Sequence, residues 1–307
     1  MVRHLTVIGF GNIGKQIASQ LLHSASAPLS LNVVDPDPSI EGAYWDFQDA
    51  VELHPQHQLH WNNEHCFDNS DVIFHCAGAA VPMGESRLVT SASSIEITED
   101  IFKNQTFNKQ PFIIVMANPV ELIAHITQRL TNFPPSRIVG TGTLLDSLRM
   151  QRFIQRDYPH LKKVHPLLLG EHGQGAYLSL ELSTINKEPM KKHLNQLNIN
   201  ALMGKVKNAA DQIKKTQGAT IYGVSFCALQ IYASLFDQQK TMLPVCTYLN
   251  EALIKQLGGH QSYLSLPSKL NQEGAYALED YPTSKDELKQ LEKAQSLLDD
   301  CLPRHYH

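Results

Sequence analysis

A glycine-rich turn near the start of the chain lies between a strand-like run and a helical pattern. Residues 3–9 are largely apolar and include β-branched side chains, and residues 9–14 then read Gly-Phe-Gly-Asn-Ile-Gly. Ile13, Ile17 and Leu21 recur at four-residue intervals, which is the spacing of one helix face. The order strand, glycine turn, helix is typical of a unit whose turn approaches a pyrophosphate and whose helix N-terminus meets its charge.

An acidic residue follows the next strand-like run. Residues 31–34 are apolar except for one asparagine, and Asp35 comes 21 residues after Gly14. In dinucleotide-binding units, an acid at this distance binds the ribose hydroxyls of NAD and would repel the additional phosphate of NADP. We therefore expect NAD as the cofactor. The residues expected to bind it belong to the glycine turn and to the ends of predicted strands: Gly9, Gly11, Asn12, Ile13, Gly14, Asp35, Gly78 and Asn118.

Strand-like and helix-like patterns alternate through the first half of the chain. Apolar runs at 71–76, 111–116 and 137–139 predict strands, and the pattern at 120–130 predicts a helix. This alternation is typical of a parallel, doubly wound sheet whose ligands bind beyond the carboxyl ends of the strands. We therefore predict an α/β fold with an N-terminal Rossmann domain over residues 1–143.

Beyond residue 149 the patterns become mixed, which predicts an α+β substrate domain over residues 144–307. A capping box of Ser284 and Glu287 indicates the start of a closing helix. The other elements expected in this half are a possible strand at 177–185, helices at about 196–216 and 221–235, and short strands near 243–249 and 262–266.

Composition gives no sign of a nucleic-acid or membrane partner. The net charge is −4, no apolar run approaches the length of a membrane span, and the odd number of cysteines, 5, argues against a disulfide framework. These features favour a cytoplasmic protein with a small-molecule ligand.

Four histidines lie close together in the sequence: His54, His57, His60 and His65. Pro55 would interrupt a helix there, so we expect solvated surface histidines and no metal site.

An acid, two arginines and a histidine occupy positions that suit catalysis. In residues 140–149, two glycines follow a strand-like run and a helix then begins, so that Asp146 and Arg149 share one helix face. A buried carboxylate could orient a histidine and an arginine could bind a substrate carboxylate, whereas a surface ion pair is the alternative. His172 lies in a glycine-flanked loop, and Arg87 follows a flexible segment at a strand end, as on a mobile lid.

Taken in order, these motifs resemble those of the lactate/malate dehydrogenase family, and the resemblance covers nearly the whole chain. The motifs are the glycine turn with Asp35, Cys76-Ala77-Gly78, Gly84-Glu85-Ser86-Arg87-Leu88, Asn118-Pro119-Val120, residues 145–149, Gly170-Glu171-His172-Gly173, residues 215–220 and Ser265-Leu266-Pro267. The resemblance implies an NAD-dependent L-2-hydroxyacid dehydrogenase that acts on a small 2-oxo or 2-hydroxy acid and assembles as a homodimer or homotetramer.

The roles implied by the resemblance divide into catalysis and substrate binding. His172 would be the general acid/base, Asp146 would hold its imidazole and favour its protonated form, and Arg87 on the lid would polarise the substrate carbonyl. The residues that would bind the substrate are Arg149, through a two-pronged salt bridge to the carboxylate, and Asn118, Thr220 and Val81.

Val81 bears on the identity of the substrate. In this family the residue three positions before Gly84 faces the variable group of the substrate, and it is arginine in malate dehydrogenases and commonly glutamine in lactate dehydrogenases. Residues 79–83 contain no cation, so a dicarboxylate would keep an unpaired charge in a closing site. We therefore expect an apolar substrate side chain. The fragments at 45–50 and 140–152 look most similar to the L-2-hydroxyisocaproate dehydrogenase branch.

Two departures from the family pattern concern the cofactor and the lid. Ala80 stands where many relatives have an arginine near the cofactor pyrophosphate, so weaker NAD binding is expected. The segment 90–99, rich in serine and threonine, does not follow the usual lactate dehydrogenase helix.

The alternatives to an L-2-hydroxyacid dehydrogenase with an apolar substrate are a malate dehydrogenase, a non-catalytic NAD-binding sensor that signals through an oligomer interface, and a metal-assisted, NAD-dependent glycosidase on a related fold.

Overall fold

The computed structural model describes residues 2–63, 65–236, 241–260, 262–281 and 284–307. Its central feature is a sheet whose parallel part has the strand order β3-β2-β1-β4-β5-β6. These strands are β1 Arg3–Ile8, β2 Leu29–Val34, β3 Gln58–Trp61, β4 Val72–His75, β5 Phe112–Val115 and β6 Ile138–Gly140. The order is that of a Rossmann sheet, which confirms the predicted fold class.

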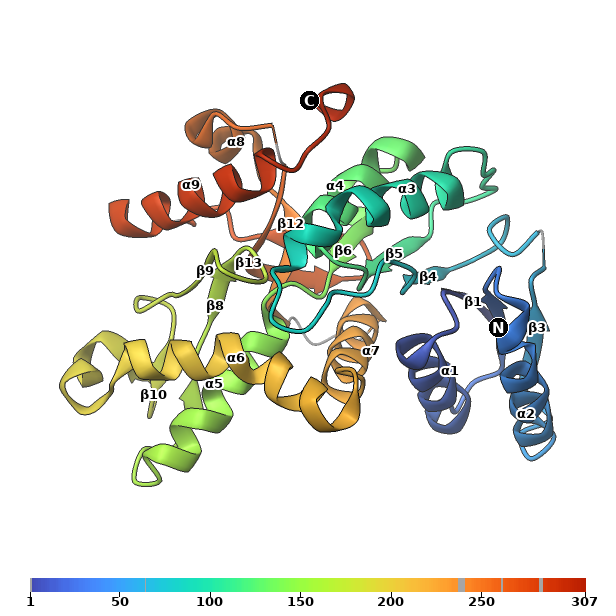
Figure 1. The fold of residues 1–307 in the computed structure, drawn as a ribbon, viewed down its shortest axis with the longest axis horizontal. Helices are drawn as coiled ribbons and strands as arrows, with labels where there is room; N and C mark the ends of the chain where they lie inside the picture. Colours follow the sequence, from blue (N-terminus) through green and yellow to red (C-terminus); the bar gives the residue numbers. More distant parts are fainter. Residues whose placement is uncertain (1, 64, 237–240, 261, 282–283) are drawn as a thin grey trace.

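Helices cover both faces of the parallel strands (Figure 1). In chain order they are α1 Asn12–Ser24, α2 Glu41–Val51, α3 Ser91–Phe102, α4 Val120–Thr131, α5 Leu144–Asp157, α6 Ile199–Gln217, α7 Tyr222–Phe236, α8 Glu251–Leu257 and α9 Lys285–Asp299. Residues of α1 and α7 form a core with one face of the sheet, and residues of α3 and α4 form a core with the other. Neighbouring strand residues such as Phe112 and Ile113 enter opposite cores, so β5 is apolar at every position.

The sheet continues beyond β6 with antiparallel strands. β12 pairs with β6 through Cys246 and Gly140, and β13, β8 and β9 follow, with β14 paired to β13. A small separate sheet has the order β11-β10-β7. The strands of this half are β7 Val164–His165, β8 Leu168–Gly170, β9 Ala176–Leu178, β10 Thr184–Ile185, β11 Glu188–Pro189, β12 Thr241–Tyr248, β13 Tyr263–Asn271 and β14 Gly274–Ala277.

The helices and the short strands predicted in the second half are present. The helices expected at about 196–216 and 221–235 are α6 and α7, and the strands expected near 243–249 and 262–266 are β12 and β13. The Ser284 hydroxyl oxygen accepts a hydrogen bond from the Glu287 amide at 3.2 Å and caps α9 as the sequence indicates.

Two local predictions are wrong. Residues 177–185 are not one strand, because Ser183 donates its amide to the Ser179 carbonyl and closes a turn between β9 and β10, which belong to different sheets. The histidine-rich segment, in which no strand was predicted, contains β3, because residues 58–61 pair with β2. A lone edge strand with a polar sequence carries little periodic signal, which explains why it was missed.

The histidines of this segment do not all lie at the surface. His57 is buried, and its Nδ1 accepts a hydrogen bond from the Leu29 amide at 3.2 Å. His54 and His60 are half-buried, and His65 is exposed. The expectation of solvated histidines is therefore wrong for His57, which satisfies a backbone donor at the start of β2. Within the described residues, no group of three or more histidine, cysteine or acidic side chains could hold a metal ion.

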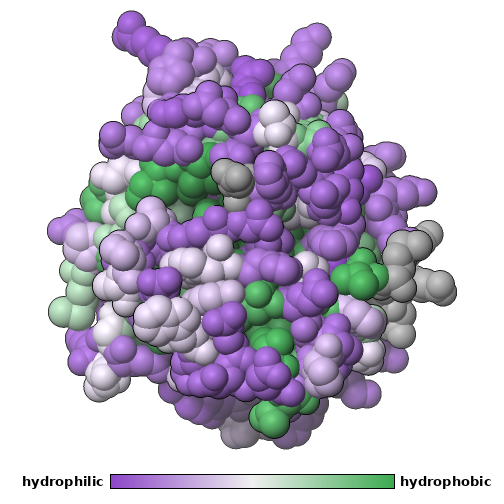
Figure 2. Space-filling view, turned by 90° about the vertical axis from the view of Figure 1, so that its right-hand side faces the viewer, coloured by the Kyte–Doolittle hydropathy of each residue, from purple (hydrophilic) through white to green (hydrophobic). Residues whose placement is uncertain are grey.

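The surface of the molecule is described by the distribution of hydrophilic and apolar side chains. The side of the molecule turned to the viewer in Figure 2, near α2 and β3, is mainly hydrophilic, with apolar side chains in separate areas. Of the helices in the described part of the chain, none is both long enough and apolar enough to cross a membrane.

Candidate active site

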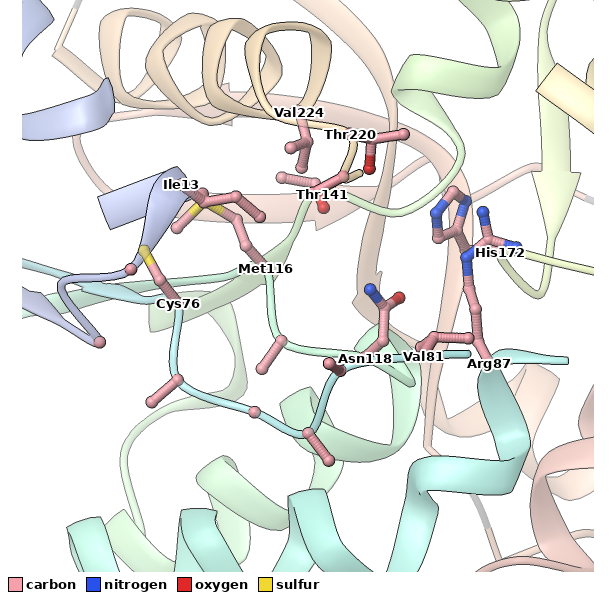
Figure 3. A pocket seen from close by; sticks show the side chains of 18 of the residues that line it. Ile13, Cys76, Val81, Arg87, Met116, Asn118, Thr141, His172, Thr220 and Val224 are labelled. Atoms are coloured by element: carbon pink, nitrogen blue, oxygen red, sulfur yellow. The ribbon is translucent and has the colours of Figure 1, made fainter. Parts of the chain in front are cut away.

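A cleft of about 1290 Å³ lies at the carboxyl ends of the parallel strands. It reaches from the glycine turn at residues 9–14, past the strand ends, to the loop of His172 and one face of α6. Figure 3 shows Ile13 and Cys76 at one end and His172 with Arg87 at the other, with Asn118 near His172. All residues predicted to bind cofactor or substrate, or to do chemistry, line this cleft.

The glycine turn is fixed by close backbone packing. Gly9 has a φ of +85°, and a Cβ there would lie 2.7 Å from the Ala77 nitrogen. A Cβ on Gly14 would lie 2.0 Å from the Gly9 carbonyl oxygen, so neither position accepts a side chain. Gly11 differs, because a Cβ there meets no atom of the described residues within 4 Å. Open space in front of Gly11, at the N-cap of α1, suits the pyrophosphate of a dinucleotide.

Asp35 is held beside this turn by backbone amides. Its Oδ2 accepts a hydrogen bond from the Phe10 amide at 2.7 Å, and its Oδ1 accepts one from the Asp37 amide at 3.0 Å. Asn62, which sequence reasoning missed, exchanges two 2.9 Å hydrogen bonds with the Asp35 backbone. A carboxylate has about four acceptor positions, so this one can still accept from two hydroxyls. The residues at this end therefore fit NAD.

His172, Asp146 and Arg149 form a hydrogen-bonded chain whose two helical members are buried. His172 Nδ1 donates to Asp146 Oδ2 at 2.6 Å, and Arg149 Nη1 donates to Asp146 Oδ1 at 3.2 Å. The side chains of Asp146 and Arg149 are only 7% and 6% exposed, so the alternative of a surface ion pair is wrong. Because the Asp146 carboxylate accepts the hydrogen bond of His172 Nδ1, the second imidazole nitrogen, Nε2, is free to bond a ligand in the cleft.

The charges in this chain shift the titration of its members. Burial alone would raise the pKa of Asp146, but His172, Arg87 and Arg149 outweigh it and lower that pKa to about 2. Burial lowers the pKa of His172, as does the charge of Arg87, while the Asp146 carboxylate opposes both. Asp146 is thus a permanent anion that partly restores the affinity of a buried imidazole for its proton.

The lid and two further pocket residues complete the site. Arg87 begins a short 3₁₀ helix, Arg87–Thr90, and Figure 3 shows it with Val81 close to Asn118 and His172. The Asn118 Oδ1 atom is buried and has no hydrogen-bond partner within the described residues. Because an unpaired buried amide oxygen is costly, this atom indicates a ligand with a donor group. Thr220 lies across the cleft (Figure 3).

α6 supplies contacts to the lid that sequence reasoning missed. Lys214 Nζ donates to the Val81 carbonyl at 3.0 Å, and the Gly84 amide donates to Asp211 Oδ1 at 3.3 Å. Lys207, Asp211 and Lys214 all line the cleft, at spacings that place them on one helix face. That spacing is visible in the sequence, but the direction in which the face points is not.

The serine- and threonine-rich segment 90–99 forms most of α3. The Ser94 hydroxyl accepts a hydrogen bond from the Ala79 amide at 3.1 Å, and Thr98 Oγ1 lies 3.2 Å from His75 Nε2. The segment is therefore a helix despite its departure from the family pattern. Its small polar side chains are buried because they hydrogen-bond the base of the lid and the end of β4.

Sequence models of one family match almost the entire chain. Residues 3–140 match the lactate/malate dehydrogenase NAD binding domain, and residues 143–306 match the lactate/malate dehydrogenase alpha/beta C-terminal domain. The chain belongs to the lactate/malate dehydrogenase family. As a member of that family it is an NAD-dependent oxidoreductase acting on 2-hydroxy acids, as the resemblance implied.

Individual relatives support the same family. The L-lactate dehydrogenase of Clostridium botulinum is 27% identical over 308 residues, covering 97% of this chain and 95% of that protein. L-lactate dehydrogenase 2 of Lactobacillus acidophilus is 28% identical over 281 residues, covering 89% of each. The crystal structure of malate dehydrogenase from Plasmodium falciparum shares the fold with a TM-score of 0.84 at 19% identity, covering 98% of this chain and 97% of that one. The L-2-hydroxyisocaproate dehydrogenase branch stays a prediction within the lactate/malate dehydrogenase family.

Proposed function

We propose that this protein is an L-2-hydroxyacid dehydrogenase that reversibly reduces a 2-oxo acid with an apolar side chain. The observation that carries the proposal is the hydrogen-bonded chain of His172, Asp146 and Arg149, whose free groups face a cleft with a dinucleotide-type turn at its other end. A non-catalytic NAD-binding sensor has no need of an arginine and a histidine both bonded to one buried carboxylate, because burying these charges costs free energy.

The proton is supplied by His172. When bound along the glycine turn and Asp35, NADH supplies a hydride to the substrate carbonyl carbon. Protonated His172 then gives its proton to the carbonyl oxygen, which becomes the hydroxyl of the product, and the imidazole is left neutral. In the opposite direction the neutral imidazole accepts that proton. Asp146 holds the ring by its other nitrogen throughout, so the proton moves along a fixed direction.

The substrate is held by the two arginines and by Asn118. Arg149, which is buried at the side of the cleft, binds the carboxylate in a bidentate salt bridge. Arg87 polarises the carbonyl, and its charge acts at low dielectric once the lid is closed. Asn118 hydrogen-bonds the substrate, and Thr220 lines the pocket opposite.

The side chain of the substrate would lie against Val81. The lid segment 79–83 has no cation to pair with a second carboxylate, which supports an apolar substrate. One observation favours malate dehydrogenase as a second candidate, since Lys214 brings an ammonium group to the Val81 carbonyl from α6. An ammonium there could pair with the second carboxylate of a dicarboxylic substrate.

The test is oxidation of NADH by the purified protein with pyruvate, 2-oxobutyrate, 2-oxoisocaproate, phenylpyruvate and oxaloacetate. We expect the highest kcat/KM with a bulky apolar 2-oxo acid, and a loss of about 10²- to 10⁴-fold in His172→Asn with NADH affinity retained. The highest kcat/KM with oxaloacetate would make the protein a malate dehydrogenase. Binding of NADH without turnover of any of these acids would support the non-catalytic alternative.

We also propose that the protein assembles as a homodimer or homotetramer in the cytoplasm. Three large apolar side chains on different helices are about half exposed: Trp45 on α2 at 59%, Leu148 on α5 at 48% and Phe226 on α7 at 55%. Such side chains are typical of interfaces. The cysteines, all of them free, suit a reducing compartment. Sedimentation equilibrium that gives a monomer at micromolar concentration would refute the assembly.

A further inference from the structure

A buried glutamate lies behind the histidine loop and is bonded to its backbone. Glu121, in the first turn of α4, is 1% exposed. Its Oε1 accepts hydrogen bonds from the His172 amide at 3.0 Å and from the Ser265 hydroxyl at 2.8 Å. Its Oε2 is buried and has no partner among the described residues. One oxygen therefore fixes the backbone of the candidate catalytic residue, while the other is left in the protein interior.

A second carboxyl fills the inside of the same loop. Glu171 is also 1% exposed, and its Oε2 accepts a hydrogen bond from the Gly175 amide at 2.7 Å. A Cβ on Gly173 would lie 2.3 Å from Glu171 Oε1, so the loop is wrapped tightly around this carboxyl group. The position of His172 is thus set by Glu121 from outside the loop and by Glu171 from within it.

These two carboxyls are close enough to affect each other, and the charges of Arg87 and Lys207 oppose the effect of burial on the pKa of Glu171 alone. No ion pair within the described residues includes Glu121 or Glu171. Burial, with the charge of Glu171, raises the pKa of Glu121 to about 8, and burial also raises the pKa of Glu171. Two neighbouring buried carboxyls do not both ionise readily, so a proton is retained.

We propose that Glu121 is a positioning residue of this enzyme, a neutral carboxylic acid that fixes the His172 backbone and so aims its imidazole at the substrate. The proposal rests on the proposed role of His172. The neutral form keeps the acceptor oxygen that His172 and Ser265 need, and it adds no charge to a site that already holds Asp146. The titratable groups around Glu121 are Glu171, His172 and Cys246, and the charges of Arg87, Asp146 and Lys207 act on Glu171.

The neutral form makes a distinct prediction for Glu121→Gln, which keeps the shape and the acceptor oxygen. We expect kcat/KM for 2-oxo acid reduction within about threefold of the original protein, and an unchanged pH midpoint for its decline. If Glu121 were ionised, its removal would take a negative charge from the surroundings of His172 and move that midpoint to lower pH by about one unit, which would overturn the proposal.

The positioning role is tested by Glu121→Asp, whose carboxyl is one methylene group shorter. We expect kcat to fall by about 10- to 100-fold with the KM for NADH unchanged, because the imidazole is misplaced by about 1 Å. Glu251→Gln, at an exposed position in the first turn of α8, is the matched control and should change neither quantity. An Asp variant with normal kcat would show that Glu121 positions nothing.

Amide hydrogen exchange separates this proposal from the proposed function. The His172 amide should stay protected in Glu121→Gln and lose protection in Glu121→Asp, whether or not any 2-oxo acid is turned over. Loss of protection in both variants, or in neither, would overturn the role of Glu121. Absence of turnover in the original protein would overturn the proposed function alone.

Discussion

The two ends of the cleft are built in different ways. Most of the cofactor end comes from one continuous strand–helix–strand segment. Its specific features are the close packing at Gly9 and Gly14 and the backbone amides that hold the Asp35 carboxylate. The substrate end is formed by side chains from separate segments, with Arg87 on the lid, Asp146 on α5 and His172 in the β8–β9 loop.

This difference predicts different responses to substitution. At the cofactor end, shape is set by contacts between backbone atoms, so an added methyl group acts through packing. At the substrate end, charged side chains interact with one another, so removal of one charge changes the titration of the others. Substitutions at the substrate end should therefore alter rates and pH dependence, whereas those at the cofactor end should alter folding or affinity.

The largest effect is expected for Asp146→Asn. The variant keeps the shape but removes the carboxylate that opposes the effects of burial and of Arg87 on His172, so the pKa of His172 falls further. Since reduction needs protonated His172, the decline of kcat/KM with rising pH should move to lower pH. The value at neutral pH should fall by about 10²- to 10⁴-fold. The pH profile of NADH oxidation measures both changes, and fluorescence titration with NADH should give an affinity within about twofold.

The opposite outcome would contradict the proposed role of Asp146. If the variant kept its rate and its pH midpoint, Asp146 would not control the proton of His172. If NADH affinity fell as much as the rate, the two ends of the cleft would not be independent.

A smaller effect is expected at the cofactor end, where two glycines of one turn should respond differently. In Gly14→Ala the new Cβ would meet the Gly9 carbonyl oxygen at 2.0 Å, so the variant should lose about 1–3 kcal/mol of unfolding free energy. In Gly11→Ala the described residues leave space, so stability should be kept while NADH binds about tenfold more weakly, a loss of about 1.4 kcal/mol.

Urea unfolding measures the stability of both variants, and NADH titration measures their affinity for the cofactor. Each variant serves as the control of the other, because both add one methyl group to the same turn. Normal NADH affinity in Gly11→Ala would mean that the pyrophosphate does not approach this glycine and that the open space there has another use.

The same contrast explains how much could be predicted from the sequence. The glycine turn and Asp35 could be predicted because their geometry is decided within a short segment by glycine sterics and strand ends. Asp146 and Arg149 could be paired from their spacing on a helix. Their burial could not be predicted from that spacing, because it depends on how α5 packs.

Residues whose role depends on distant packing were missed. Glu121 and Lys214 look like ordinary charged residues of helices, and only the fold brings them to His172 and Val81. His57 was misjudged for the same reason, since its partner is the Leu29 amide of another strand. Polar residues that satisfy long-range partners leave no periodic pattern in a sequence.

The smallest effect is expected for Lys214→Met, which removes the ammonium group near Val81 and keeps an apolar stem of similar length. If this group pairs with a second carboxylate, the ratio of kcat/KM for oxaloacetate to that for 2-oxoisocaproate should fall by about two- to fivefold, the range of an exposed or half-buried ion pair. Lys215→Met is the matched control, because Lys215 is exposed on the same helix and does not line the cleft. A ratio that stays unchanged in both variants would mean that Lys214 acts only on the lid backbone. The apolar surface of Val81 would then be the feature that selects the substrate, and substrate specificity, like catalysis, would reside at the substrate end of the cleft.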